Sequence, residues 1–360
     1  MPNASSHSPR AHSCYCVTAH SAPLSFEART LPEPKGREVI VEMAGAGVCH
    51  SDIHIWEGHY DLGSGKKLTL SDRGIKLPLT MGHEVAGEII AVGPDVERSR
   101  LGARVVVYPW IGCGECPTCK RGDENICLKP RCLGVHRDGG YAGAVLVPDV
   151  RYCVDLGNLD PAEAAPLACS GVTTYSALKK FGARLADHPV VIIGAGGLGR
   201  MALSMLEAMG GKGAVVVDID PAKREAAIKA GAIAAIDGAA PDAANQIARA
   251  TGGALMLLDL VGSSSTLQLA VESATRGTDI VVVGLYGGEV TVPVPFFPLR
   301  PMCIRGSYVG NLAELKELVV LANSGRLRLV PVTRRPLAEA YDALMTLKAG
   351  KVDGRIVLVP

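Results

Sequence analysis

The sequence lacks three features: a substantial net charge, a long apolar run and an export signal. Its formal charge at pH 7 is +1, which gives no electrostatic basis for binding nucleic acid or an anionic membrane surface. No apolar run approaches the ~18 residues that a membrane-spanning helix needs. We therefore expect neither nucleic acid nor a membrane among its partners.

The N-terminal residues do not have the composition of a targeting peptide. The run MPNASSHSPRAHS is polar and contains no apolar core of a signal peptide. We predict that residues 1–13 form a disordered tail. The chain also has 11 cysteines, an odd number, which indicates reduced thiols rather than a disulfide framework. Together these observations predict a cytoplasmic protein.

Length and local pattern predict two domains. At 360 residues, the chain is longer than one hydrophobic core usually supports. From Cys14 to about Leu156, short β-type runs alternate with glycine and proline, which favours an irregular β-barrel-like domain. From about Pro161, apolar strands alternate with alanine-rich helices, as in a doubly wound parallel sheet. The predicted strands are 190–194, 214–218, 255–262 and 279–284, and the predicted helices are 200–210 and 222–231.

Four cysteines in the run GCGECPTCKRGDENIC predict a structural zinc site. They are Cys113, Cys116, Cys119 and Cys127, with gaps of two, two and seven residues. Four sulfurs around a tetrahedron are what such a site requires. Two short disulfides or four free thiols are the alternatives. The odd cysteine total and the lack of an export signal disfavour the disulfides.

The run VVIIG leads into a glycine-rich turn that is typical of dinucleotide binding. A strand, the turn and a helix follow in the required order. The helix N-terminus can then face a pyrophosphate, and Asp218 at the end of the next strand can accept hydrogen bonds from the ribose hydroxyls. That carboxylate favours NAD over NADP. The predicted residues of the turn are Gly194, Gly196, Gly197, Leu198 and Gly199; the alternative is a glycine turn with a chance aspartate.

Three further segments contain candidate metal ligands: GVCHSDIH (47–54), GHE (82–84) and ACSGVTTY (168–175). A single Cys or His in one segment is more often a core residue than a ligand. Together with the cysteine loop and the glycine turn, the segments resemble the zinc-dependent medium-chain alcohol dehydrogenases, from about Cys14 to Val359. The resemblance implies an α/β protein with two domains. They are a GroES-like irregular β-barrel catalytic domain of residues 14–170 and 306–360, and a doubly wound Rossmann NAD-binding domain of residues 171–305.

The resemblance also implies a catalytic zinc ion, held by Cys49, His83 and Cys169. Two thiolates and one imidazole leave one coordination position open, as a catalytic zinc requires. Glu84 then lies near the metal, and Asp52 orients the imidazole of the ligand. With the four-cysteine loop, this gives two zinc ions per chain.

A proton relay and cofactor contacts follow from the same resemblance. Ser51 and His54 match a relay that carries the alcohol proton towards solvent, and Thr173 matches a contact on the nicotinamide side. The other cofactor contacts are Lys223 at the adenine ribose, and His50 and Arg355 at the pyrophosphate. The implied reaction is reversible hydride transfer from an alcohol to NAD.

Several runs, among them HIWEGHYDLGSGKK and VYPWIGCGEC, resemble bacterial 6-hydroxyhexanoate dehydrogenases. This implies an ω-hydroxy acid or a medium-chain primary alcohol as substrate, with Trp56 and Trp110 lining the substrate cleft. The segment Tyr60–Pro78 is longer than in the general family. Its cations Lys66, Lys67 and Arg73 could orient a substrate carboxylate, or they could belong to a solvated loop.

Other functions remain open on the same fold. They are a zinc-free reductase, a secondary or aromatic alcohol dehydrogenase or ketone reductase, and a non-catalytic protein. The seven predicted metal ligands argue against the first, and the complete set of ligands and relay residues argues against the last. The resemblance implies a small alcohol or aldehyde as the partner, and a homotetramer as the assembly.

Overall fold

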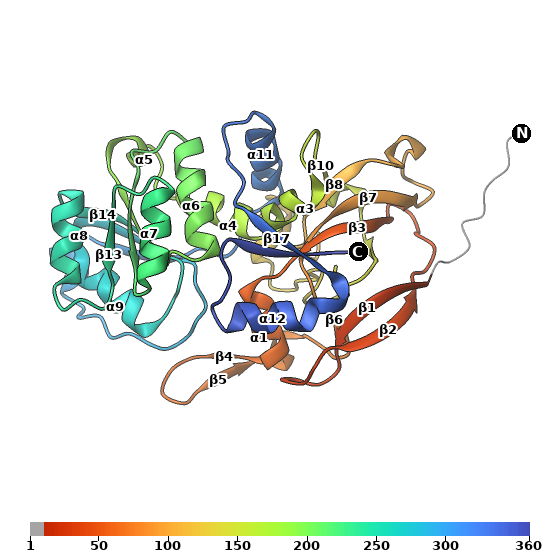
Figure 1. Ribbon diagram of the computed structural model, residues 1–360, viewed down its shortest axis with the longest axis horizontal. Coiled ribbons are helices and arrows are strands. Elements are labelled where there is room, and N and C mark those ends of the chain that lie inside the picture. The colour runs from red at the N-terminus through yellow and green to blue at the C-terminus, as the bar shows by residue number, and fades with distance from the viewer. Residues whose placement is uncertain (1–10) are drawn as a thin grey trace, which may run out of the picture.

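Two large sheets of different kinds organise the chain in the computed structural model, which describes residues 11–360 (Figure 1). One sheet is mostly antiparallel and is built from the first and last parts of the chain, whereas the other is wholly parallel and uses the middle. They lie at opposite ends of the long axis in Figure 1.

The antiparallel sheet has seven strands in the order β10-β8-β7-β3-β18-β17, with β9 also paired to β3. Strand β18 near the C-terminus pairs with β3, so the chain returns to the lobe in which it began. The strands are β3 (Val39–Gly47), β7 (Glu84–Val92), β8 (Arg104–Val107), β9 (Ala144–Val147), β10 (Cys153–Asp155), β17 (Val332–Pro336) and β18 (Arg355–Val359).

A three-stranded sheet precedes it, in the order β2-β1-β6. Its strands are β1 (Ala11–Val17), β2 (Ser25–Thr30) and β6 (Leu79–Thr80). This corrects the predicted tail of residues 1–13, because Ala11–Ser13 pair with Ala28–Thr30 in the antiparallel ladder. Within this sheet, residues 11–13 pair only with β2, because β6 reaches β1 only at Cys16 and Val17, and this one-sided backbone pairing tolerates their polar sequence. Residues 1–10 of that prediction lie outside the described part of the chain.

The parallel sheet has six strands in the order β13-β12-β11-β14-β15-β16. The strands are β11 (Val190–Ile193), β12 (Ala214–Asp218), β13 (Ala234–Asp237), β14 (Ala254–Asp259), β15 (Ala274–Val282) and β16 (Cys303–Gly306). The apolar runs predicted as strands form β11, β12, β14 and β15. Because β16 ends at Gly306, we propose a boundary at 306 rather than 305 between the NAD-binding domain and the returning segment.

Twelve α-helices connect these strands in the described part of the chain. They are α1 (His50–Glu57), α2 (Pro117–Lys120), α3 (Pro161–Ala164), α4 (Ser170–Lys179), α5 (Arg184–Asp187), α6 (Gly197–Ala208), α7 (Pro221–Lys229), α8 (Ala243–Thr251), α9 (Ser264–Ser273), α10 (Phe296–Leu299), α11 (Leu312–Asn323) and α12 (Ala340–Lys348). Short 3-10 turns are η1 (Ser71–Arg73), η2 (Arg98–Arg100), η3 (Glu124–Ile126), η4 (Val150–Tyr152), η5 (Ala165–Ala168) and η6 (Leu337–Glu339).

Alternation along the central strands explains why the parallel sheet is covered on both faces. In β11, Val190 and Ile192 join one hydrophobic cluster, whereas Val191 and Ile193 join another. Successive side chains of a strand point to opposite faces, so an uninterrupted apolar run indicates a strand with packing on both sides. The carboxyl end of β11 leads directly into the glycine turn, and Asp218 at the carboxyl end of β12 accepts a hydrogen bond from that turn.

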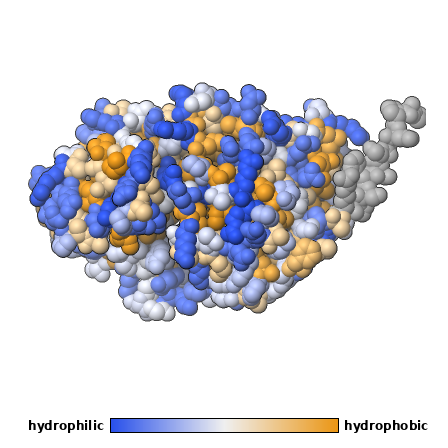
Figure 2. Space-filling model, viewed as in Figure 1, coloured by the Kyte–Doolittle hydropathy of each residue, from blue (hydrophilic) through white to orange (hydrophobic). Residues whose placement is uncertain are grey.

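No helix within residues 11–360 is long and apolar enough to cross a membrane. On the face drawn in Figure 2, hydrophilic and hydrophobic residues lie interspersed in small patches rather than in one broad apolar band.

Candidate active site and metal centres

Three predicted ligands from distant segments meet in one buried cluster. Cys49 precedes α1, His83 precedes β7, and Cys169 lies between η5 and α4. The Sγ atoms of Cys49 and Cys169 are 4.0 Å apart, and the three donor atoms lie within 4.8 Å of one another. His83 Nε2 is buried, with no hydrogen-bond partner within residues 11–360. A buried nitrogen without a partner beside two sulfurs fits a bound metal ion.

Cys49 is the more acidic thiol of the cluster. A hydrogen bond from Cys169, together with His83, lowers the pKa of Cys49 well below its usual value, although burial acts in the opposite direction. The thiolate is the form of cysteine that binds metals. The cluster therefore presents an anionic sulfur where a metal ligand is needed.

Asp52 fixes the orientation of His83. Its Oδ1 lies 3.1 Å from His83 Nδ1, while its Oδ2 accepts hydrogen bonds from the Cys49 N–H at 2.9 Å and from the Tyr141 hydroxyl at 3.0 Å. Burial lowers the pKa of His83, but Asp52 and Cys49 together raise that pKa well above its usual value. The carboxylate thus makes the imidazole a better electron donor. Tyr141 is fully buried and was missed by the sequence analysis, because no motif marks it.

Glu84 and Arg355 form a buried ion pair next to this cluster. Arg355 Nη2 lies 2.6 and 2.5 Å from the two carboxylate oxygens of Glu84, and Glu84 Oε1 also accepts the Ser170 N–H at 3.2 Å. Gly47 leaves the room for this carboxylate, since a Cβ there would lie 1.9 Å from Glu84 Oε2. A Cβ at Gly197 would lie 2.9 Å from Arg355 Cδ. Arg355 therefore connects the cluster with the glycine turn.

The glycine turn has the geometry that the sequence predicts for a dinucleotide site. Gly194 has a φ of +100°, and Gly196 precedes the first turn of α6, which begins at Gly197 and contains Leu198. A Cβ at Gly199 would lie 2.1 Å from the Gly194 carbonyl oxygen, so helix and strand touch there. Asp218 Oδ2 accepts the Ala195 N–H at 2.7 Å, which holds the carboxylate against the turn.

Two of the other predicted cofactor contacts, His50 and Lys223, are electrostatically linked to Arg355, whereas Thr173 follows the ligand Cys169. The pKa of His50 is lowered, mainly by desolvation. Cys49 acts to raise this pKa, whereas the charges of Arg355 and Lys223 lower it, so all three groups act on the His50 ring. Thr173 lies on α4, one helical turn after Cys169, and its buried Oγ1 has no hydrogen-bond partner within residues 11–360. A buried hydroxyl without a partner fits a ligand with polar groups.

Ser51 and His54 lie three residues apart on α1 and so share one face of the helix. Both are half-buried, and burial is the main cause that lowers the pKa of His54 from its usual 6.5. His54 is therefore a neutral base at pH 7. The Tyr60 ring lies 4.8 Å from the His54 ring, and this neighbour was not predicted.

Only one of the two predicted cleft tryptophans contacts the cluster. The Trp110 ring lies 5.2 Å from the His83 ring and 5.9 Å from the Tyr308 ring. Trp56 instead donates to the Ala22 carbonyl at 2.6 Å and packs against α12, through Tyr341 and Lys348. The structure therefore does not bring Trp56 to the metal cluster, and its place in the substrate cleft stays a prediction. Trp56 follows His54 by two residues, about 200° around the helix, and so faces away from the relay.

The segment Tyr60–Pro78 forms a hairpin, β4 (His59–Asp61) and β5 (Lys67–Thr69), followed by η1. The tip of the hairpin touches the parallel-sheet lobe, where Ser64 donates to the Glu289 carboxylate. Lys66, Lys67 and Arg73 are all exposed. Of the three, only Arg73 contacts an aromatic ring near the cluster, with its guanidinium carbon 5.7 Å from the centre of the Tyr60 ring.

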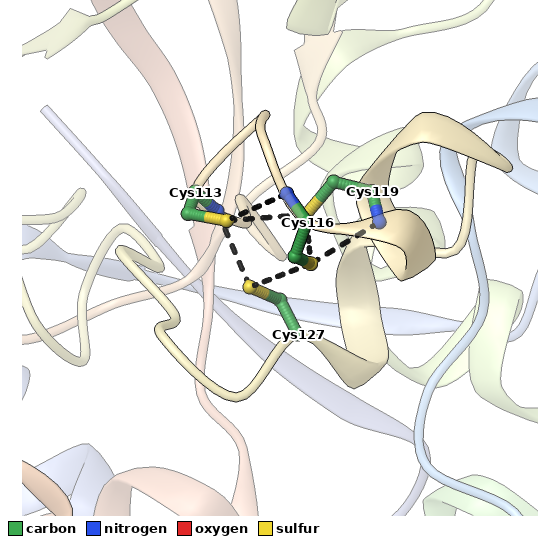
Figure 3. Close-up of side chains that lie close together, drawn as sticks. All are labelled: Cys113, Cys116, Cys119 and Cys127. Carbon is green, nitrogen blue, oxygen red and sulfur yellow. Dashed lines mark hydrogen bonds between the residues drawn. The ribbon is translucent and has the colours of Figure 1, made fainter.

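The four-cysteine loop is assembled as predicted (Figure 3). The Sγ atoms are 3.5 Å apart for Cys116 and Cys119, and 3.9 Å apart for Cys113 and Cys119 and for Cys116 and Cys127. Backbone N–H groups also point at these sulfurs, and N–H bonds from Glu115 and Cys116 are the main reason that the pKa of Cys113 falls to about 6. Four close sulfurs with such donors fit a structural zinc ion.

Comparisons with known proteins agree with this geometry. Residues 35–158 match the alcohol dehydrogenase GroES-like domain, and residues 197–324 match the zinc-binding dehydrogenase domain. The NAD-dependent alcohol dehydrogenase of Sulfurisphaera tokodaii is 39% identical over 94% of this chain and 97% of its own length. The D-arabinose 1-dehydrogenase (NADP(+)) of Saccharolobus solfataricus is 33% identical over 94% and 95%. The crystal structure of the alcohol dehydrogenase of Aeropyrum pernix superposes with a TM-score of 0.87 at 33% identity, over 97% of this chain and 100% of that one.

Proposed function

The chain belongs to the zinc-binding alcohol dehydrogenase family, and from this premise we propose that it oxidises a primary alcohol reversibly to the aldehyde with NAD. The observation that carries the proposal is the buried cluster of Cys49, His83 and Cys169, which lies beside the glycine turn. Arg355 joins the two, since it binds Glu84 and packs against Gly197.

Two zinc ions per chain have separate roles in this proposal. Cys49, His83 and Cys169 hold one, and the four sulfurs of the cysteine loop hold the other and stabilise that lobe. When bound, the first zinc ion polarises the substrate oxygen as a Lewis acid, and NAD accepts the hydride. Every other task in the reaction falls to side chains of the chain itself.

The side chains of α1 move the proton of the alcohol. Ser51 accepts it first and passes it to His54, which is neutral at pH 7 because burial lowers its pKa. Both residues are only half-buried, so the proton can continue to solvent. Tyr60 and Trp110 flank this path and keep the reacting end of the substrate in an aromatic environment.

The cofactor is oriented by groups from both lobes. Asp218 binds the adenosine ribose and disfavours a 2′-phosphate, and Lys223 on α7 is the second contact that we propose for this ribose. Arg355 supplies positive charge to the pyrophosphate at the start of α6, and His50, whose lowered pKa favours the neutral imidazole, offers it a hydrogen bond. Thr173 offers its hydroxyl to the nicotinamide. Since one relative bears NADP(+) in its name, kcat/KM should be measured with both cofactors.

We further propose that the preferred alcohol carries a remote carboxylate, as 6-hydroxyhexanoate does. Burial raises the pKa of Tyr60 and of Tyr308, and the positive charge of Arg73 acts on both hydroxyls. Tyr308 in turn meets Trp110 edge to face, and Trp110 contacts His83. The rings of Tyr60, Tyr308 and Trp110 thus lie between the metal cluster and the positive charge of Arg73. Within residues 11–360, Arg73 has no ion-pair partner of its own.

A substrate panel tests both levels of the proposal. The panel contains 6-hydroxyhexanoate, 1-hexanol, a secondary alcohol and an aromatic alcohol, each with NAD and NADP. We expect the highest kcat/KM for 6-hydroxyhexanoate with NAD.

The role of Arg73 is tested by substitution. Arg73→Ala should raise KM for 6-hydroxyhexanoate about tenfold and leave KM for 1-hexanol unchanged, with Lys66→Ala and Lys67→Ala as matched controls. Equal effects on both alcohols would remove the carboxylate from the proposal, and a preference for the secondary alcohol or its ketone would replace the primary-alcohol assignment.

We propose a cytoplasmic homotetramer as the assembly. The segment after β15 exposes a series of large apolar side chains, which a subunit contact would cover. They are Leu285, Tyr286, Val294, Phe297 and Leu299. Light scattering of the purified protein should give four times the chain mass of 37.5 kDa. A mass equal to that of one chain would refute the assembly.

A further inference from the structure

A second pair of cysteines lies outside both zinc clusters, on the N-terminal strand. Cys14 and Cys16 lie two residues apart on β1, so their side chains point to the same face of the strand. They are only 1% and 0% exposed. The register places Glu27 of β2 opposite Cys14, and Thr80 of β6 opposite Cys16. Two thiols, a carboxylate and a hydroxyl therefore converge from three strands.

The distances between these groups match those of the zinc clusters in the same chain. The Cys14 and Cys16 sulfurs are 3.8 Å apart, against 3.5 to 4.0 Å for the sulfur pairs of the other two clusters. Donor atoms of Cys14, Cys16 and Glu27 lie within 4.8 Å of one another. Thr80 Oγ1 lies 3.3 Å from Cys16 Sγ, as a possible fourth donor.

We propose that Cys14, Cys16 and Glu27 form a third metal site, which takes a thiophilic divalent cation of the zinc class. Two sulfur ligands select such an ion over magnesium or calcium. Binding releases the two thiol protons, which pass to solvent, and forms two sulfur–metal bonds without any change of oxidation state.

Arg29 gives this site its charge balance. Its guanidinium lies 2.8 Å from Glu27 Oε2 and 2.9 Å from Asp138 Oδ2, so Glu27 keeps its other oxygen for a metal. Two thiolates, Glu27, Asp138 and Arg29 carry a combined charge of −3, which a divalent cation reduces to −1. Without metal, two neutral thiols with Glu27, Asp138 and Arg29 also carry −1. The net charge is therefore the same in both states, and Asp138, with 53% of its side chain exposed, meets water.

A disulfide fits these two cysteines less well. Residues two apart on a strand have Cα atoms about 6.7 Å from each other, at the upper limit for a disulfide. A bridging metal requires no such approach, because the sulfurs already have the spacing of neighbouring ligands. Oxidation would instead pull the strand out of its pairing with β2 and β6.

The site lies where a metal would reinforce the loop that carries His83. Strand β6 ends at Thr80, three residues before His83. Strand β1 is also hydrogen-bonded to the segment that carries Tyr141, because the Tyr15 N–H donates to the Tyr141 carbonyl. A metal that joins β1, β2 and β6 would thus tie the N-terminal strand to the segment between Thr80 and His83. The role is structural, and turnover does not pass through it.

Metal counting on the full-length protein tests the proposal. The protein is dialysed against buffered zinc, and bound zinc is measured per chain. We expect three zinc ions in the wild type and in the control Cys153→Ser, which changes a buried cysteine outside all three clusters. Cys14→Ser/Cys16→Ser should hold two and keep its dehydrogenase activity.

Glu27→Gln provides a second arm, since it keeps both thiols in the core. It should weaken the third zinc ion at least tenfold and leave the other two in place. Two zinc ions in the wild type, or three in the double cysteine variant, would overturn the proposal. If the double variant fails to fold, the wild-type count and Glu27→Gln decide. Failure here leaves the proposed function intact, because that function rests on the other two clusters.

Discussion

Arg355 holds Glu84 in a buried ion pair with contacts of 2.5 and 2.6 Å, although 271 residues separate them in the chain. Glu84 follows the ligand His83, and Arg355 packs against Gly197 at the start of α6. One guanidinium is therefore shared by the metal cluster and the cofactor turn. We therefore expect the chemistry on one lobe and the binding of the cofactor on the other to be coupled through this pair.

Arg355→Met should cost about 3–5 kcal/mol of unfolding free energy, because Glu84 is left buried without its partner. It should also raise KM for NAD. Denaturant unfolding and steady-state kinetics measure the two effects. The double variant Glu84→Gln/Arg355→Met should recover most of the stability but not the affinity for NAD. Recovery of both would mean that Arg355 has no role at the cofactor.

His54→Gln should lower kcat/KM at pH 7 by about 10²-fold, because the proton loses its route to solvent. Burial lowers the pKa of His54 below 6.5, so the neutral base persists to lower pH and is lost only as pH falls through that lowered pKa. The wild-type acid limb should therefore lie below pH 6.5 and disappear in the variant. Added imidazole should restore part of the rate. An unchanged pH profile would remove His54 from the relay.

Asp218→Asn and Asp218→Gly should lower kcat/KM with NAD by about 10- to 100-fold, as expected for lost hydrogen bonds to a charged group. The asparagine variant keeps an oxygen for the Ala195 N–H and loses only the charge. With NADP, kcat/KM should rise in both variants, because the repulsion of the 2′-phosphate is gone. A wild-type enzyme that already prefers NADP would contradict the role of Asp218.

Tyr141→Phe should weaken zinc binding at the Cys49–His83–Cys169 cluster about 10- to 100-fold, since Asp52 loses one of the donors that orient it. Competition with a chelator measures that affinity. Tyr108→Phe is the matched control, because the Tyr108 hydroxyl is equally buried but donates to the Gly310 carbonyl instead. Equal loss of zinc affinity in both variants would indicate a general packing effect.

The sequence predicts best those features whose residues are close together in the chain. The cysteine loop and the glycine turn are local patterns, and both have the expected geometry. Cys49, His83 and Cys169 are far apart, so their convergence followed from family resemblance alone. Helical periodicity places Trp56 on the opposite face of α1 from His54, whereas Tyr60 on β4 meets His54 through a contact that periodicity does not predict.

Other features could not be predicted because they depend on contacts between distant strands. Tyr141 and Asp52 are 89 residues apart in the chain. No sequence motif marks a tyrosine that donates a hydrogen bond to the carboxylate that orients the metal ligand His83. The cluster of Cys14, Cys16 and Glu27 depends on the register of β1 with β2. The sequence predicts Cys14 and Cys16 within the β-barrel-like domain, but their spacing alone does not show that Glu27 lies opposite Cys14.

The most direct test of the central claim compares Cys169→Ala with Cys116→Ala, through zinc content, turnover and stability of each purified variant. Cys169→Ala should lose one zinc ion and all measurable NAD-dependent alcohol oxidation, while it keeps the wild-type melting temperature within a few degrees. Cys116→Ala should also lose one zinc ion, but its main effect should be a large loss of stability. Full activity in a folded Cys169→Ala variant, or in wild-type protein stripped of zinc, would contradict the account.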